Sequence, residues 1–294
     1  MPDNTAEQLE IITCSYRPDV ERCRRLCASV DRYVEAAIGH VLIVPRRDLA
    51  LFAGLANGRR RVLVAEDVLP RRFFQLPGSE RFWMDARGWP VRGWILQQLL
   101  KLSATRVTQA ELIVFADSDL QFVRPFDRGH VYRNGRLRLH RIPGAMNHGR
   151  HLNWHRRAGE LLGRPTTYFG SDYVGQLITW RRSLLEDLHR HIERIHGKPW
   201  HVVVSRSLDV SEYILYGSFA EHFAVDEAGG HYFEERDLCH CCWVEAQADD
   251  LMLGRARLAP DAVALLIQSN LGLDDGEEDR LFAQASAGME QGVA

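Results

Sequence analysis

A chain of 294 residues is long enough to bury a large α/β core. Its hydrophobic content of 46% and charged content of 26% are ordinary for a globular protein, and its net charge of −2 gives no argument for nucleic-acid binding. No apolar run approaches the ~18 residues that span a bilayer, and the polar first ten residues are unlike a signal peptide. We therefore expect a cytoplasmic protein without a transmembrane segment.

The first part of the chain alternates apolar runs with amphipathic segments. The apolar runs predict strands at residues 9–14, 40–44 and 61–65, and Asp19 can cap a helix that ends near residue 33. Strands that alternate with helices predict a mixed, mostly parallel sheet flanked by helices. The first strand is not followed by G-x-G-x-x-G, and the chain has no P-loop, which argues against both nucleotide-binding motifs.

Residues 92–102 predict a helix that leads into the next strand. Its apolar residues share one face, while Gln98 and Lys101 lie together on another at a spacing of three. Lys101 is one of only two lysines among 37 basic residues, so it is more informative than any single arginine. A ligand-binding face and a solvated face are the two interpretations of this pattern.

The apolar run at residues 112–116 predicts a strand buried on both faces of the sheet, and it ends in Asp117-Ser118-Asp119. Residues two apart in an extended chain point to the same side, so both carboxylates leave the strand end together. Open α/β sheets bind ligands at the carboxyl ends of their strands. Because two such carboxylates repel, and oxygen ligands suit Mg²⁺ or Mn²⁺, we predict a divalent metal site. A solvent-exposed acidic turn is the alternative.

The rest of the chain predicts shorter elements. A hairpin is expected at residues 131–140, with Asn134-Gly135 at its turn. Asp209 or Ser211 can cap a helix that begins after residue 207, which places Glu212 in the first turn. Other predicted elements are helices at 148–162 and 183–196 and strands at 173–180 and 262–267.

The six cysteines lie in two groups, one near the start of the chain and one around His240: Cys14, Cys23 and Cys27, then Cys239, Cys241 and Cys242. Neither group has the C-x₂-C spacing of common zinc sites. Reduced and partly buried thiols are therefore the expected state, with a shared zinc site as the alternative.

Several of these segments together resemble a known enzyme class. The strand, the Asp-x-Asp triplet and the following Val-Arg-Pro-Phe at residues 123–126 resemble the metal-binding segment of GT-A glycosyltransferases. Lys101-Leu102 is similar to the lysine-leucine pair of glycogenin-type enzymes. With residues 13–16 and 211–217, the pattern is similar to a bacterial family of uncharacterised GT-A-type glycosyltransferases. The resemblance implies a GT-A-like, Rossmann-like fold and sugar transfer from a nucleotide-diphosphate sugar, most commonly a UDP-sugar, to an unknown acceptor.

The resemblance also implies a set of site residues. Asp117 and Asp119 would hold Mn²⁺ or Mg²⁺, with one late histidine as the third ligand: His222, His231 or His240. The donor would contact residues of the first strand end, the helix and the Asp-x-Asp segment: Thr13, Ser15, Tyr16, Gln98, Lys101, Asp117 and Ser118. We favour an inverting transfer, which needs a general base, and the candidates are Glu212 and then Asp172. A retaining transfer would need none.

The same comparison suggests how the chain is divided. We expect one domain at residues 1–274, with residues 9–130 binding the nucleotide sugar and residues 131–274 the acceptor. The acidic segment at 275–294 predicts a flexible tail. Two other functions stay open: a metal-dependent nucleotidyltransferase or phosphotransferase, and a non-catalytic protein that binds a sugar nucleotide.

Overall fold

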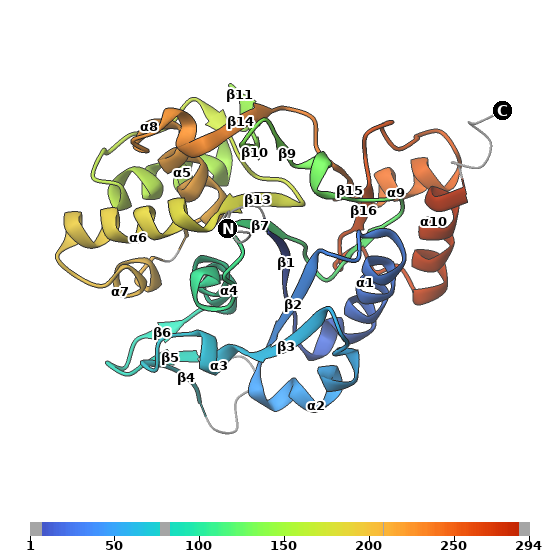
Figure 1. Ribbon diagram of the computed structural model, residues 1–294, viewed down its shortest axis with the longest axis horizontal. Coiled ribbons are helices and arrows are strands. Elements are labelled where there is room, and N and C mark those ends of the chain that lie inside the picture. The colour runs from blue at the N-terminus through green and yellow to red at the C-terminus, as the bar shows by residue number, and fades with distance from the viewer. Residues whose placement is uncertain (1–7, 77–82, 208, 288–294) are drawn as a thin grey trace, which may run out of the picture.

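The computed structural model describes residues 8–76, 83–207 and 209–287. Its central sheet has five strands in the order β13-β7-β1-β2-β3 (Figure 1). Four of them are parallel: β1 (Leu9–Cys14), β2 (Gly39–Val44), β3 (Arg60–Val64) and β7 (Leu112–Phe115). The fifth, β13 (Ile178–Arg181), pairs with β7 in the antiparallel sense. The predicted mixed, mostly parallel sheet is confirmed.

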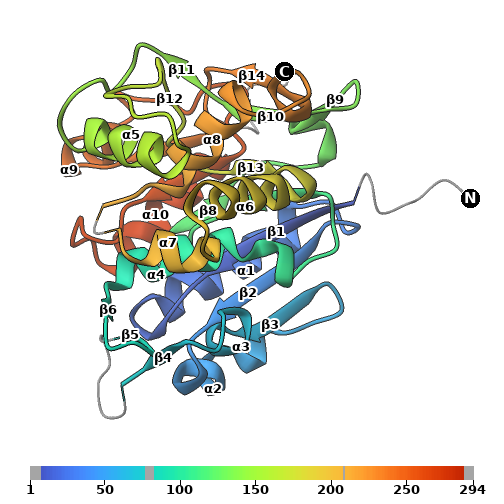
Figure 2. The ribbon, with the colours of Figure 1, turned by 90° about the vertical axis from the view of Figure 1, so that its left-hand side faces the viewer.

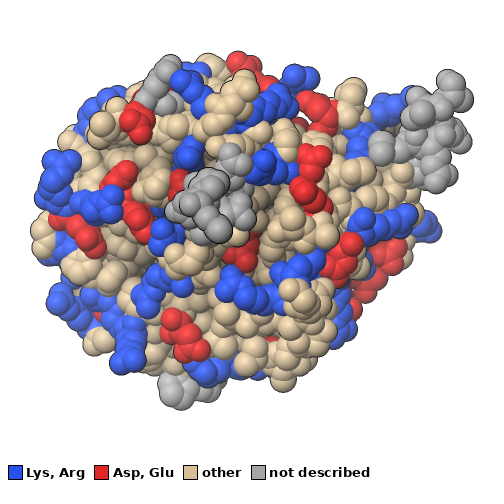
Figure 3. Space-filling view, viewed as in Figure 1, with Lys and Arg blue, Asp and Glu red and all other residues tan. Residues whose placement is uncertain are grey.

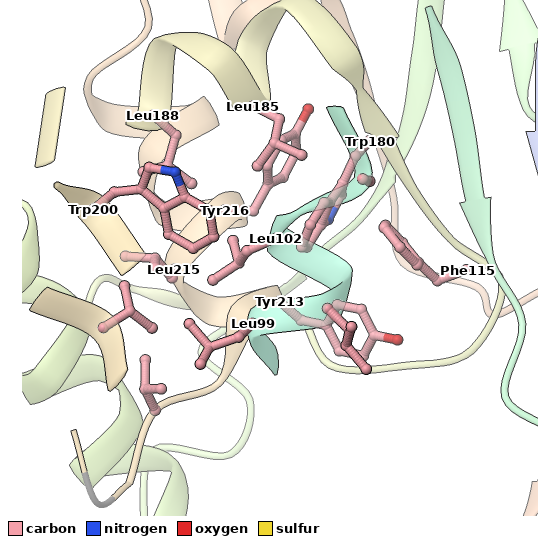
Figure 4. Close-up of a cluster of buried hydrophobic side chains, with 14 of the residues drawn as sticks. Leu99, Leu102, Phe115, Trp180, Leu185, Leu188, Trp200, Tyr213, Leu215 and Tyr216 are labelled. Carbon is pink, nitrogen blue, oxygen red and sulfur yellow. The ribbon is translucent and has the colours of Figure 1, made fainter. Parts of the chain in front are cut away.

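Helices and smaller sheets cover the two faces of this sheet. Alternate residues of each strand point to opposite faces, so Ile12 and Phe115 join one core while Ile11 and Val114 join the other. The first core is closed by α4 (Gly93–Leu102), α5 (Gly149–Leu161), α6 (Arg182–His196), α7 (Trp200–Ser205) and α8 (Glu212–His222). Figure 4 shows how α4, α6 and α8 bring their large side chains together there. The second core is closed by α1 (Val20–Tyr33) and strands of the smaller sheets.

The smaller sheets lie around this centre. One contains β15 (Cys239–Cys242), β16 (Ala264–Ile267) and β8 (Leu120–Phe122), and another β14 (His231–Glu234), β10 (Arg136–His140) and β9 (Tyr132–Arg133). A third contains β4 (Phe73–Gln75), β5 (Trp83–Asp85) and β6 (Pro90–Val91), and β11 (Ile142–Pro143) pairs with β12 (Ser171–Asp172). Short helices α2 (Leu49–Phe52) and α3 (Ala65–Val68) follow β2 and β3.

The predicted hairpin at residues 131–140 is confirmed. Strands β9 and β10 pair in the antiparallel sense, and Asn134 and Gly135 have φ values of 51° and 77° at the turn. Both values are positive, as a type I′ turn requires. By contrast, the predicted strand at 173–180 is wrong in its first half. Leu177 has a φ of 51°, which no strand residue adopts, so only the end of the segment joins β13.

The prediction of a flexible tail is wrong for residues 275–287, which form helix α10 (Asp275–Ala287). Its buried Leu281 and Phe282 share a core with β16 and with α9 (Glu245–Met252). The buried Glu278 accepts hydrogen bonds from Arg22 and Arg25 of α1, at 2.7 and 2.9 Å. An isolated helix of this length is only marginally stable in water, so α10 depends on this apolar packing and on these ion pairs for its stability. Residues 288–294 lie outside the described residues.

No helix within the described residues is long and apolar enough to cross a membrane.

Candidate functional site

The site lies where the strand order of the central sheet reverses. The chain adds β2 and β3 on one side of β1, whereas β7 lies on the other side. The carboxyl ends of β1 and β7 therefore flank the point at which open α/β sheets form a ligand crevice. Asp117 and Asp119 follow β7 directly, and Ser15 and Tyr16 follow β1. In Figure 2 these carboxyl ends of the strands are on the left, beside α4.

Lys101 is the centre of a charge network in this crevice. Its Nζ lies 3.0 Å from Asp117 Oδ1 and 3.2 Å from Glu212 Oε1, and it donates a hydrogen bond of 2.7 Å to the Tyr213 hydroxyl. Gln176 Nε2 donates to the second oxygen of Asp117 at 3.1 Å. Lys101 is 7% exposed and Glu212 is 2% exposed, whereas the Asp117 side chain is 35% exposed. Of the two carboxylates, Asp117 is thus the one that still faces solvent.

The network sets the charges of its members. Burial would lower the pKa of Lys101, but Asp117, Tyr213 and Glu212 raise it well above its usual range. Burial would raise the pKa of Asp117, but the Lys101 ammonium and the hydrogen bonds from Lys101 and Gln176 lower it. Lys101 and Asp117 are therefore charged at neutral pH. Burial raises the pKa of Glu212, an effect that Lys101 opposes only in part.

Asp119 has a different environment from Asp117. Desolvation, the Asp117 carboxylate and Asp19 raise its pKa to about 7, against weaker stabilisation that includes the Ser269 N–H at 3.4 Å. Ser118 hydrogen-bonds the nearby Asp19, at the start of α1. No basic side chain among the described residues forms an ion pair with Asp119. Asp119 thus carries negative charge that the protein itself leaves unbalanced above pH 7.

The described residues do not supply a complete set of metal ligands. In the described part of the chain, no three His, Cys, Asp or Glu side chains are grouped so that they could hold a metal ion. Asp117 and Asp119 supply carboxylate oxygens, and Mg²⁺ commonly uses one or two carboxylates together with substrate phosphates and waters. The pair therefore fits a divalent cation that arrives with a phosphate-bearing ligand, and it does not form a closed metal site.

Two of the three predicted histidine ligands, His222 and His231, have other partners. His222 is ten residues beyond Glu212 on α8, about 15 Å along the helix, and its Nε2 lies 3.1 Å from the Phe169 carbonyl. His231 on β14 lies 3.3 Å from the Tyr216 hydroxyl, and His240 is part of β15. The assignment of His222 to the metal site is therefore wrong, because helix α8 carries it away from Asp117.

Two predicted donor contacts are held inside the protein instead. The Thr13 hydroxyl is fully buried and lies 3.1 Å from His40 Nε2, whose other ring nitrogen accepts from Arg60 at 3.0 Å. Gln98 Oε1 accepts a hydrogen bond of 2.7 Å from the Glu212 backbone N–H. Neither group faces the crevice in this form. Gln98 instead fixes the start of α8, and so the position of Glu212.

A pocket of about 680 Å³ adjoins the site at the ends of β1, β2 and β3. Its walls combine aromatic and basic side chains from the loop after β1, the loop after β2, β5 and the start of α4: Tyr16, Arg17, Arg47, Trp83 and Trp94, with the predicted Ser15. The buried Asp48 braces this wall by accepting hydrogen bonds from the Arg17 backbone and side chain. Tyr16 is exposed at the mouth. The pocket offers stacking surfaces beside positive charge.

The model of one protein family matches residues 8–239, which is most of the chain. The chain belongs to the family described as Family of unknown function (DUF6492). The matched residues include Lys101, Asp117 and Glu212, but not Ser269 or α10. No curated protein matches this DUF6492 member.

Asp172, the second candidate for the general base, pairs with a histidine in this DUF6492 protein and not with Lys101. It is buried, and its Oδ1 lies 3.0 Å from Nδ1 of His151 on α5. His151 contacts Trp154 at a ring distance of 4.5 Å, and Trp154 stacks on the pocket residue Trp94 at 5.7 Å. An Asp-His pair thus adjoins the pocket through two tryptophans. The pairing of His151 with Asp172 could not be predicted from sequence, because 21 residues separate the two.

Gln176 and Tyr213 are further site residues that the sequence analysis missed. Tyr213 lies in the 211–217 segment that was singled out, but Gln176 follows an irregular turn without any motif. The cysteines, in contrast, follow the expectation of free thiols: all six are free, and five are buried.

Proposed function

We propose that this DUF6492 protein is a metal-dependent GT-A-type glycosyltransferase whose donor is a nucleotide-diphosphate sugar, with UDP-sugars as the first candidates. The observation that carries the proposal is the Asp117/Asp119 pair at the strand-order reversal, next to a pocket of nucleotide size. Above pH 7 the charge of the Asp119 carboxylate is not balanced by a basic side chain, and the adjoining pocket is aromatic and basic. This combination suits a cation bound together with a diphosphate better than it suits either ligand alone.

The residues divide into two functions in this proposal. Tyr16, Trp83 and Trp94 offer stacking surfaces for a nucleobase, and Arg17 and Arg47 offer positive charge. Asp117 and Asp119 would hold Mn²⁺ or Mg²⁺, which when bound offsets the negative charge that develops on the leaving diphosphate. Lys101, predicted to contact the donor, instead fixes Asp117 through the 3.0 Å ion pair. Its effect on the donor would then be indirect.

Glu212 fits a positioning role better than the predicted role of general base. Its carboxylate is 2% exposed and lies against Lys101, so an acceptor hydroxyl has no open path to it. For an inverting transfer, we propose that the His151–Asp172 pair accepts the proton. With Nδ1 donating to Asp172, Nε2 would be the basic atom of His151.

The substitution Glu212→Gln distinguishes a positioning role of Glu212 from a role as general base. As a positioning residue, Glu212 balances Lys101, and its neutralisation should weaken metal-dependent donor binding about tenfold while turnover at saturating donor falls less. Isothermal titration and kinetics on the same preparation measure both quantities. Unchanged donor affinity with a loss on the order of 10² in turnover would instead restore Glu212 as the base.

Thermal unfolding with a panel of nucleoside diphosphates and nucleotide sugars, with and without Mn²⁺, tests the proposed function. We expect one nucleotide to raise Tm only when Mn²⁺ is present, because a ligand at 100 times its Kd adds about 2.7 kcal/mol to the free energy of unfolding. The incubated donor should then release a nucleoside diphosphate. Release of pyrophosphate would point to a nucleotidyltransferase, and binding without turnover to a non-catalytic protein. No shift with any nucleotide, with or without Mn²⁺, would contradict all three functions.

A further inference from the structure

The three-stranded sheet of β4, β5 and β6 has two apolar faces, although only one of them packs on the protein. The strand register places Phe73 opposite Asp85, and Trp83 opposite Val91, on the inner face, where all four are buried. It places Phe74 opposite Met84, and Met84 opposite Pro90, on the outer face. An antiparallel sheet with one solvated face normally carries polar residues there. The outer face of this sheet is therefore apolar without a covering element among the described residues.

The exposed apolar surface continues beyond the strands. Phe74 is 42% exposed on β4, and Leu76 follows it as a further exposed side chain. Trp89, in the turn before β6, is 61% exposed, more than any other described aromatic residue. Single exposed apolar residues are ordinary on protein surfaces, whereas a cluster on one small sheet marks an interaction site. We call Phe74, Leu76, Met84 and Trp89 the outer patch.

Positive charge surrounds the outer patch. Arg71, Arg87 and Arg92 are exposed on the same segment. Within residues 70–76 and 83–92 the only acidic residue is Asp85, which is buried and paired with Arg72. At the lower left of Figure 3, where Figure 1 places β4, β5 and β6, several Lys and Arg side chains lie around one group of acidic side chains. The protein as a whole is nearly neutral, so this local excess is a property of the segment.

We propose that the outer patch docks the protein on an anionic lipid surface. Aromatic side chains favour the membrane interface, and each arginine near an anionic bilayer adds about fivefold in affinity. A stable protein partner would need about 800 Å² on each side, whereas the outer face is made by strands of two or three residues. Small area, protruding aromatics and exposed arginines together favour a lipid headgroup layer over a folded partner.

The docking surface and the pocket lie on two sides of one strand. Met84 belongs to the outer patch. Its neighbour Trp83 faces the other way and lines the pocket that adjoins Asp117 and Asp119. Docking would therefore hold the pocket close to the lipid surface, separated from it by the β4-β5-β6 sheet. The docking itself does not depend on the proposed function. One consequence does rest on it: if the protein is a glycosyltransferase, its acceptor is carried by a lipid.

Co-sedimentation with vesicles tests the docking. The full chain should bind vesicles that contain phosphatidylglycerol, bind phosphatidylcholine vesicles at least tenfold more weakly, and dissociate as salt rises. The double variant Phe74→Ser/Trp89→Ser should lose binding at least tenfold, as should Arg71→Gln/Arg87→Gln. Phe233→Ser and Arg24→Gln are matched controls, because Phe233 is similarly exposed at 38% on β14 and Arg24 is exposed on α1. Neither control should change binding.

Other results would overturn the proposal. Absence of vesicle binding by the native chain would do so, as would equal binding by the patch variants and the controls. A native dimer that the Phe74→Ser/Trp89→Ser variant converts to a monomer would assign the patch to a second copy of the chain. The substitutions face outward, so unfolding temperatures should stay near the native value. Donor-induced stabilisation should also persist in these variants, which keeps failure of docking separate from failure of the proposed function.

Discussion

Replacing Lys101 with methionine should destabilise the protein strongly, with a loss on the order of 3–5 kcal/mol in the free energy of unfolding. Methionine keeps the apolar stem but removes the ammonium that lies 3.0 Å from Asp117 and 3.2 Å from Glu212. Asp117 can recover some hydration, because its side chain is 35% exposed, whereas Glu212 at 2% cannot. At about 2–4 °C for each kcal/mol, differential scanning calorimetry should show Tm fall by at least ~6 °C.

A second substitution shows whether the unpaired Glu212 causes the loss. Lys101→Met/Glu212→Gln removes the more deeply buried of the two carboxylates that contact Lys101 together with its partner, so it should recover most of the stability. Lys198→Met is the matched control, because Lys198 is the other lysine of the chain and is exposed. It should leave Tm unchanged. Equal Tm losses in the single and double variants would show that Lys101 stabilises the protein by packing and not by charge.

Much of this architecture follows from patterns within single segments. The apolar run before Asp117 predicts a buried strand, and β7 occupies it. The Asn134-Gly135 pair predicts a tight hairpin turn, and both residues have positive φ. In each case the physical cause lies within a few residues, in side-chain alternation or in backbone freedom. Local patterns therefore also placed the Asp-x-Asp pair at the end of its strand.

The errors arise where a distant residue decides the outcome. Gln98 looks like a ligand-facing residue on its helix, but its partner is the Glu212 N–H, 114 positions away. Residues 275–287 look like a solvated acidic tail, but Arg22 and Arg25 pair with Glu278 across more than 250 positions. Spacing within a segment contains no information on such contacts. The role of Lys101 also changed for this reason, since Tyr213 and Glu212 enclose it from α8.

Replacing Asp119 with asparagine should abolish metal-dependent donor binding and yet stabilise the unliganded protein. Asparagine keeps the shape and one oxygen but removes the charge that a divalent cation requires, so Mn²⁺-dependent nucleotide affinity should fall at least 100-fold by isothermal titration. The Asp119 carboxyl has a pKa of about 7 against an ordinary value of 3.8, so the fold favours its protonated form. Native stability should then fall as pH rises from about 4 to 7, and the variant should lack this loss.

The sign of the stability change distinguishes Asp119 from its neighbour. At pH 8 Asp119→Asn should melt a few degrees above the native protein. The gap should narrow as pH falls to 5, where Asp119 is protonated in the folded state, and close near pH 4, where it is also protonated in the unfolded state. Asp117→Asn should do the opposite at pH 8, because it removes the Asp117 partner of the buried Lys101 ammonium. In the native protein, Mn²⁺-dependent donor affinity should weaken about tenfold for each pH unit below 7 as Asp119 takes up a proton. Calorimetry of both variants at pH 5 and 8 checks the first two results, and titration between pH 5.5 and 8 checks the third. Destabilisation by both substitutions at pH 8 would mean that Asp119 is a structural carboxylate, and the metal site would then have to be sought elsewhere.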